Sequence, residues 1–159
     1  MESLAQTVII ANMSLAENRK AHFNYEILER FDAGIELFGF EVTAIKKSQI
    51  SLEGSYVTVR GGEAFLISAS VTPIQPKNVP ADYELDRNRK LLLTKKEIAL
   101  LAAAETKNGL TIVPISVYNK GRHIKVEIAI VKGKKSYDKR ESIKRRESDR
   151  DMQRTLKGE

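Results

Sequence analysis

Cysteine is absent from this chain of 159 residues. Its absence excludes disulfide frameworks, thiolate nucleophiles and cysteine-ligated metal sites, and a reducing cytoplasm is the simplest location for such a protein. Long hydrophobic runs are also missing, since no apolar stretch approaches the roughly 20 residues of a membrane-spanning helix. The short apolar stretch at residues 8–11 has no basic residue before it and is a poor secretion signal. We therefore expect a cytoplasmic protein that is not inserted in a membrane.

Histidine is scarce, occurring only at His22 and His123, both in segments with strand patterns. A single strand histidine is more often a surface residue than a metal ligand, and neither has a partner at ligand spacing. Glu26 and Glu29 have an odd spacing, which points two strand side chains to opposite faces. Residues 132–135 lack the spaced glycines of a phosphate-binding loop. Without a catalytic constellation, the sequence predicts no enzyme, no metal and no cofactor.

Positive charge is abundant but unevenly placed. Of the net charge of +6, residues 132–159 carry +5, from eleven Lys or Arg and six Asp or Glu. A basic segment on a nearly neutral body indicates a polyanion partner, because each neutralised phosphate releases counterions. From charge alone, a tail that only improves solubility is an equally good interpretation.

The basic tail has too few apolar residues to face a core. Within residues 137–156 only Ile143, Met152 and Leu156 are aliphatic. We expect the tail to be disordered when free and helical when bound to a phosphate-lined surface. It also lacks the apolar face that membrane adsorption needs. The chain thus divides into a body, residues 1–131 with residues 1–16 flexible, and a tail, residues 132–159.

Strand patterns dominate the body. Alternation over residues 21–31 and apolar positions in residues 34–42 predict two strands, and Gly61-Gly62 joins two β-rich runs into a hairpin. A second hairpin is predicted from residues 110–118 and 123–131. Its second strand places Ile124, Val126, Ile128 and Ile130 on a core face and His123, Lys125, Glu127 and Ala129 on an available face.

Helix signals are fewer. Thr94 and Glu97 form a capping box, so a helix begins there and is expected to end at Asn108-Gly109. A second, short helix is expected within residues 43–54, and three prolines predict a long loop over residues 72–86. About six strands and few helices predict a mainly β fold, a small closed β-barrel of the oligonucleotide-binding type with short flanking helices.

Six short strings carry a family resemblance in the same order along the chain. They are ENRKA (17–21), DAG (32–34), SYV (55–57), GEAFL (62–66), RKLLL (89–93) and GKKSYDKR (133–140). With these strings in register over roughly residues 15–157, the chain resembles the SsrA-binding protein family, bacterial small protein B.

The resemblance implies a non-catalytic RNA-binding adaptor of trans-translation, the rescue of ribosomes stalled without a stop codon. The body would bind the tRNA-like domain of transfer-messenger RNA, and the tail would enter the empty messenger channel of the small subunit and fold there as a helix. Transfer-messenger RNA, small-subunit ribosomal RNA and elongation factor Tu are the implied partners, and a monomer is expected.

The body residues that match RNA-binding positions of the family are Asn18, Arg19, Lys20, His22, Asp32, Leu92 and Lys125. Lys125 suits a phosphate contact. Asp32 would bind a base edge or a 2′-hydroxyl, or hold a basic neighbour. Leu92 lies in a run of three leucines, where a core position is the default and an RNA-facing position the alternative.

In the tail, the resemblance implies ribosome contacts at Lys132, Lys134, Lys135, Tyr137, Asp138, Lys139, Arg140, Lys144, Arg145 and Arg146. Tyr137 is expected to stack on a base of the decoding centre, with packing against the barrel as the alternative. Asp138 suits the N-cap of the tail helix.

A different function also fits the charge pattern: a general ribosome-associated RNA-binding factor anchored by its tail. For such a factor the tail should dominate affinity, with a steep salt dependence and little preference among RNAs. For a rescue adaptor, the body itself should bind one structured RNA.

Overall fold

A computed structural model describes residues 14–75, 77 and 79–134. The elements are β1 (Ser14–Glu17), α2 (Arg19–Asn24), β2 (Tyr25–Ile35), α3 (Gly39–Lys46), β3 (Ile50–Ser51), β4 (Tyr56–Arg60), β5 (Glu63–Ile67), β6 (Ser70–Val71), β7 (Arg89–Leu92), α4 (Lys95–Glu105), β8 (Leu110–Lys120) and β9 (His123–Gly133). The fold is mainly β, as predicted. None of the helices in these ranges is long and apolar enough to cross a membrane.

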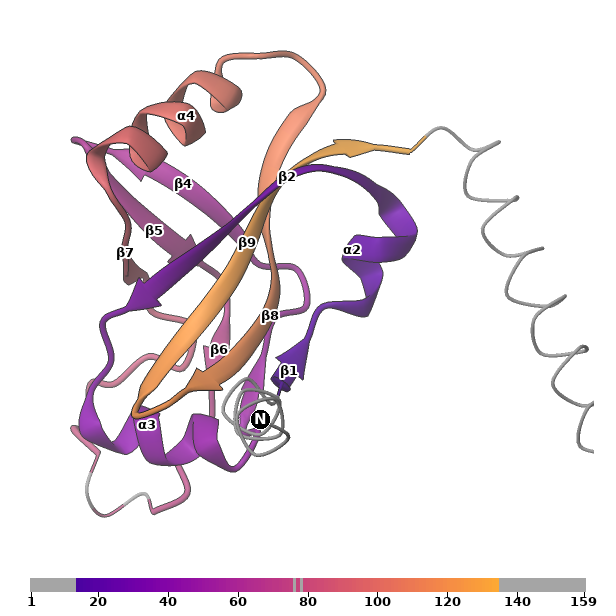
Figure 1. The fold of residues 1–159 in the computed structure, drawn as a ribbon. Helices are drawn as coiled ribbons and strands as arrows, with labels where there is room; N and C mark the ends of the chain where they lie inside the picture. Colours follow the sequence, from indigo (N-terminus) through magenta and orange to yellow (C-terminus); the bar gives the residue numbers. More distant parts are fainter. Residues whose placement is uncertain (1–13, 76, 78, 135–159) are drawn as a thin grey trace, which may run out of the picture.

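One curved antiparallel sheet forms the body (Figure 1). Its strand order is β1-β8-β9-β2-β7-β5-β4, and β3 and β6 form a separate pair. The hydrogen-bonded order has ends at β1 and β4, while β4 packs across the concave side against β8. This arrangement is compatible with the predicted oligonucleotide-binding type, but the described strands do not show a barrel closed by hydrogen bonds.

Both predicted hairpins are present. β4 and β5 meet at Gly61 and Gly62, which have positive φ angles of 57° and 76°. Glycine adopts such angles without strain, so this pair permits the tight turn. β8 and β9 pair from Leu110↔Lys132 to Lys120↔His123. The two strands are thus paired over almost their whole length of eleven residues each.

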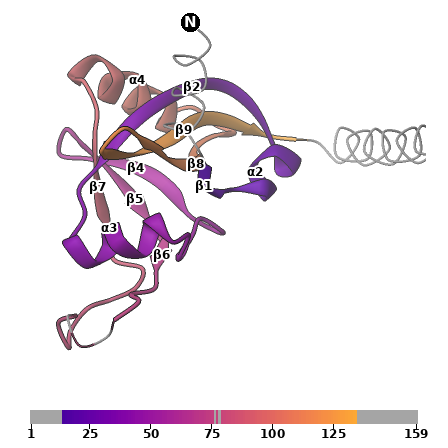
Figure 2. The ribbon, with the colours of Figure 1, turned by 60° about the horizontal axis from the view of Figure 1, so that its bottom comes forward.

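The main core lies inside the curved sheet. It includes Ile124, Val126, Ile128 and Ile130, the four residues predicted for the core face of β9. Helix α4 covers one end of the sheet and α3 the opposite end, as Figures 1 and 2 both show. The two helices therefore leave uncovered the outer face of β7 and of those parts of β2, β9 and β8 that do not pack against α2.

The predicted strand over residues 21–31 is wrong at its start. Residues 19–24 form α2, which places His22 on a helix and not on a strand. Alternating apolar residues favoured a strand, but packing of the helix on the sheet overrides that local pattern. Ala21 of α2 is buried with Val113, Ile115, Ala129 and Val131 in a second cluster on the outer face of the sheet. The predicted available face of β9 is accordingly covered from Ala129 onward.

The boundary between β2 and α3 also differs from the prediction. A single strand of eleven residues runs to Ile35, with a bulge between Ile27 and Glu29, where two strands were expected. Residues 39–42, expected in a strand, begin α3, so the predicted short helix starts earlier than residue 43. The packing that holds α3 at this place is described below.

Helix α4 begins where the sequence predicts. The Glu97 N–H donates to Thr94 Oγ1 at 3.2 Å, and the Thr94 N–H donates to Glu97 Oε1 at 3.0 Å. The helix ends at Glu105, before the predicted Asn108-Gly109, and Gly109 with φ of 81° serves the turn into β8. In the described part of residues 72–86 no strand forms, which agrees with the predicted loop.

Candidate nucleic-acid interface

One row of residues crosses four strands on the outer face of the sheet. Gly34 of β2 lies opposite Leu92 of β7 on one side and opposite Lys125 of β9 on the other. Lys125 in turn lies opposite Tyr118 of β8. Because the alternate residues of β2 belong to the core, this row faces outward. The structure thus brings together Leu92 and Lys125, which are 33 residues apart in the sequence.

Leu92 lies on the surface, which decides between its two interpretations. Its side chain is 49% exposed, whereas the preceding Leu91 is buried in the core. The default of a core position is therefore wrong. Leu92 packs over Gly34, where a Cβ atom would come within 3.1 Å of Leu92 Cβ. The missing side chain at Gly34 lets Leu92 lie close against the sheet.

Asp32 belongs to the next row of the same face. Its Oδ1 accepts a hydrogen bond of 2.8 Å from the hydroxyl of Tyr118, and it lies opposite Glu127. Burial, followed by the hydrogen bond to Asp32 and its charge, raises the pKa of Tyr118 above its ordinary value. Tyr118 stays a donor, so it fixes the carboxylate of Asp32 in one orientation. The sequence predicted that Asp32 binds a base edge or a 2′-hydroxyl or holds a basic neighbour, and it did not reveal the bond from Tyr118.

A hollow of about 370 Å³ lies beside this row. Leu92 and Lys125 line it together with Arg122 and His123 at the β8–β9 turn. Leu37 and neighbouring apolar residues also line it, and Arg122 and Lys125 give the lining its positive charge. Arg122 was not singled out in the sequence because it lies in a turn, where apolar and polar residues do not alternate as they do along a strand. His123 shares the outward face of β9 with Lys125, as the alternation predicted, but it was not named as an RNA-binding residue.

The acidic residue Glu127 on this face is paired. Arg30 Nη1 donates to Glu127 Oε1 at 2.7 Å, and Ser116 Oγ lies 3.4 Å from Glu127 Oε2. This pairing reduces the repulsion that an isolated carboxylate would exert on a phosphate. Glu127 does not line the hollow, whose charged residues in the described part of the chain are Arg122 and Lys125.

Asn18 has a structural position. Its side chain is only 8% exposed, and its Nδ2 donates to the carbonyl of Pro114 at 2.9 Å. Its backbone N–H donates to the carbonyl of Ile115 at 2.8 Å. Asn18 thus ties the start of α2 to β8, and an RNA contact through its side chain would need these bonds to break.

The other predicted residues of this segment form a second surface. Arg19, Lys20 and His22 are exposed on α2, and Lys20 forms an ion pair with Glu53. Lys134 Nζ donates to the carbonyl of His22 at 3.0 Å, and the Lys134 N–H donates to the carbonyl of Asn24 at 2.9 Å. Residues at the two ends of the described chain therefore meet at α2.

This α2 surface, with exposed Lys132 beside it, lies at the far end of β9 from the hollow. Seven residues separate Lys125 from Lys132, or about 23 Å along a strand. The predicted body residues therefore do not form one site. Leu92 and Lys125 line the hollow with Asp32 in the row beside it, whereas Arg19, Lys20 and His22 form the α2 surface and Asn18 is buried.

The predicted tail residues Lys135, Tyr137, Asp138, Lys139, Arg140, Lys144, Arg145 and Arg146 lie outside the described residues.

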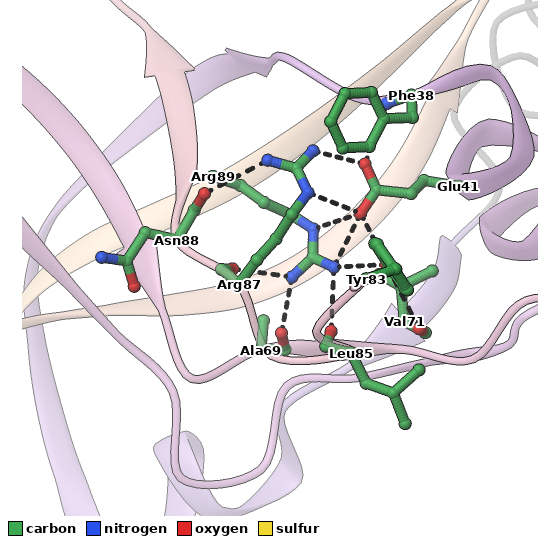
Figure 3. Close-up of polar contacts among 9 residues, drawn as sticks. All are labelled: Phe38, Glu41, Ala69, Val71, Tyr83, Leu85, Arg87, Asn88 and Arg89. Atoms are coloured by element: carbon green, nitrogen blue, oxygen red, sulfur yellow. Dashed lines mark hydrogen bonds and ion pairs between the residues drawn. The ribbon is translucent and has the colours of Figure 1, made fainter. Parts of the chain in front are cut away.

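A buried ion-pair network, which the sequence did not reveal, holds α3 and the loop before β7 (Figure 3). Glu41 and Arg89 are both fully buried, and Arg89 Nη2 donates to Glu41 Oε2 at 2.7 Å. Arg87 also pairs with Glu41, and the hydroxyl of Tyr83 donates to Glu41 Oε2 at 2.8 Å.

The arginine and carboxylate groups of this network are well satisfied. Arg89 donates further to the carbonyls of Ala69 at 2.7 Å and Leu85 at 2.9 Å. Burial alone would raise the pKa of Glu41, but hydrogen bonds from Arg87, the Phe38 N–H, Tyr83 and Arg89 outweigh it and lower the pKa to about 2. Glu41 is therefore ionised at neutral pH and fixes both arginines.

Comparisons with known proteins agree with this architecture. A family model described as SmpB protein matches residues 15–158. An SsrA-binding protein of Coxiella burnetii is 47% identical over 149 residues, covering 92% of each chain, and one of Gloeothece citriformis is 45% identical over 143 residues, covering 90% of this chain and 92% of its own. A solved chain described as "tmRNA-SmpB: a journey to the center of the bacterial ribosome" superposes with a TM-score of 0.63 at 37% identity, covering 76% of this chain and 85% of its own.

Proposed function

Because the chain belongs to the SmpB family of SsrA-binding proteins, we propose that it binds transfer-messenger RNA and delivers it to stalled ribosomes as an adaptor of trans-translation. One observation of the fold supports this most: Asp32, Leu92 and Lys125, distant in sequence, share one uncovered face of the sheet beside a hollow with a basic lining. We infer that this face takes the tRNA-like domain of the RNA.

The chemistry of the face suits RNA. Lys125 and Arg122 supply positive charge for phosphates, which position the RNA without reading its sequence. Leu92 offers an apolar surface to a ribose or a base. Asp32, held by Tyr118, accepts hydrogen bonds from a base edge or from a 2′-hydroxyl, the group that distinguishes RNA from DNA.

The α2 surface suits a different RNA contact. Arg19, Lys20 and His22 lie beside Lys132 and Lys134, at the point where the chain leaves the body toward its basic tail. We assign this surface to the ribosomal RNA of the small subunit. Residues 135–159 would then enter the messenger channel and fold as a helix, with Tyr137 stacked on a base and Asp138 as its N-cap.

The remaining partners follow from the same proposal. Elongation factor Tu would arrive with the RNA, and one copy of the protein would suffice for one RNA. The protein would act by binding alone, as an adaptor without a catalytic centre. The alternative, a general ribosome-associated factor, is supported by the basic tail and differs in which part of the chain selects the RNA.

The test is to recover the RNA that accompanies the protein from its native cells, using the full chain and a variant that ends after Lys134. The cut is placed there because β9 runs to Gly133 and Lys134 bonds to α2. We expect transfer-messenger RNA to dominate both samples, and ribosome rescue to be lost only in the shortened variant. Ribosomal RNA dominating the full chain and disappearing on truncation would contradict the proposal and favour the general factor.

A further inference from the structure

Phe38 occupies an unusual place at the start of α3. It is the N-cap residue, a position that Ser, Thr, Asp and Asn favour because their side chains accept a backbone hydrogen bond. Its side chain is also 51% exposed, which is costly for a large apolar group. An exposed phenylalanine at this position is unfavourable both as an N-cap and as a surface residue. Such a residue is expected where it serves binding.

The ring of Phe38 is held in a fixed orientation. The Arg87 guanidinium lies 4.2 Å from its centroid, and the ring of Phe40 stacks at 5.6 Å. Arg87 is itself fixed, because its Nε donates to Glu41 Oε2 at 3.1 Å and its Nη2 pairs with Glu41 Oε1 (Figure 3). The Phe38 N–H donates to the same carboxylate at 2.8 Å. The buried network thus orients an exposed aromatic ring.

A second hollow, of about 620 Å³, lies next to this ring. Phe38 and Phe65 give it apolar walls, Arg87 and Lys90 give it positive charge, and Glu36 adds one carboxylate. Lys90 forms an exposed ion pair with Glu63 at 3.0 Å, a weak interaction that can be exchanged for a phosphate, and the charge of Glu36 also acts on it. We call Phe38, Phe65, Arg87 and Lys90 the Phe38 platform.

The Phe38 platform is continuous with the RNA-binding face. Leu37 lines both the hollow beside Leu92 and the hollow beside Phe38. An RNA strand that contacts Lys125 and Leu92 would therefore reach the platform directly. Of the carboxylates near it, Glu41 is buried and Glu63 is paired with Lys90, whereas the exposed Glu36 lines the hollow. A nucleotide fits the aromatic rings and the cations together, because it has both a flat base and a phosphate.

We propose that the Phe38 platform binds one unpaired nucleotide of the RNA, with its base stacked on Phe38 and its phosphate near Lys90. This inference rests on the proposed function, because it extends the same RNA-binding face. Stacking on an aromatic ring tolerates any base. The platform therefore contributes affinity and fixes the position of a single-stranded segment without reading its sequence. The ordered ring needs no rearrangement on binding, which lowers the entropic cost.

The test measures the affinity of the full chain for transfer-messenger RNA of its own organism, with wild type, Phe38→Ala, Phe38→Leu and Phe38→Trp. We expect Phe38→Ala and Phe38→Leu to bind roughly 10-fold more weakly and Phe38→Trp to keep its affinity, because stacking requires an aromatic ring. Leu100→Ala is the matched control, since it removes another exposed apolar side chain, 42% exposed, on α4. It should bind as wild type does.

A photo-crosslinking amino acid at position 38 gives a second readout. It should join to a single-stranded nucleotide close in the RNA to those that Lys125 protects from hydroxyl radicals. Wild-type affinity in Phe38→Leu, or no crosslink to the RNA, would overturn the platform while leaving the proposed function intact. Failure of the wild type itself to bind this RNA would instead overturn the proposed function.

Discussion

The Glu41 network and the RNA-binding face use charged residues in opposite ways. Glu41 and Arg89 are fully buried, and the donors of Arg89 are directed to the carboxylate and to nearby carbonyl oxygens. Lys125 and Arg122 instead line an open hollow. Burial makes a charge dependent on its partners, whereas exposure lets a charge exchange water for a ligand. Substitutions in the two regions should therefore change different measurements.

The largest effect is expected from Arg89→Met, which removes one buried partner of Glu41 and the hydrogen bonds that Arg89 donates to the carbonyls of Ala69, Leu85 and Arg87. Breaking a buried ion pair costs about 3–5 kcal/mol of the free energy of unfolding. Urea denaturation measures it. The control Arg30→Met breaks the partly exposed pair with Glu127 and should cost less than about 1 kcal/mol. Equal losses in the two variants would contradict the distinction between buried and exposed charges.

The second-largest expected effect is a loss of stability at acid pH. The pKa of Glu41 is lowered from 4.5 to about 2 in the folded protein. A carboxyl whose pKa is lowered by folding stabilises the fold at pH values above its pKa in the unfolded state. This contribution to the free energy of unfolding is lost as pH falls from about 5 toward 2, by about 3 kcal/mol in total.

Carbon-13 NMR of the glutamate carboxyl groups is the direct measurement. The Glu41 signal should stay that of a carboxylate at pH 3, well below the ordinary pKa of a glutamate. Titration of Glu41 near 4.5 would show that the network does not hold the ionised form.

The Glu41 network also marks the limit of what the sequence could predict. Glu41 and Arg89 are 48 residues apart, and each lies in a segment where a charged residue is normally solvated. No local pattern distinguishes a buried arginine from an exposed one. The capping box at Thr94 and the Gly61-Gly62 turn were predictable because their interactions are between residues close in sequence.

The same reasoning explains the parts of the interface that sequence reasoning missed. Lys125 could be assigned to an outward face because β9 alternates over its whole length. Leu92 could not, since a run of three leucines contains both core and surface positions and only the pairing with Gly34 separates them. Six-residue α2 carries a single buried residue, Ala21, so its amphipathic signal was too weak to compete with a strand pattern.

On the RNA-binding face, substitutions should change affinity and leave stability nearly unchanged. Lys125→Ala should weaken binding of transfer-messenger RNA roughly 5–10-fold and reduce the slope of log affinity against log salt by about 1. Leu92→Ala should weaken binding roughly 5-fold without changing that slope, because the lost contact is apolar.

Titrations at several salt concentrations, with urea denaturation as the stability control, separate these outcomes. A change of slope for Leu92→Ala, or a loss of stability above about 1 kcal/mol in either variant, would show that the face also holds the fold together.

The smallest effect is expected at the α2 surface, where Lys20 pairs with Glu53 and both side chains are about two-thirds exposed. The hydrogen bond from Lys20 and its charge lower the pKa of Glu53, so Glu53 is ionised at neutral pH and competes with phosphate for the lysine. Glu53→Gln removes that competition and should strengthen ribosome binding about two-fold at low salt, whereas Lys20→Ala should weaken it. Neither should move the urea midpoint. Sedimentation with purified small subunits measures the binding, and weaker binding of Glu53→Gln would mean that Glu53 itself contacts the ribosome.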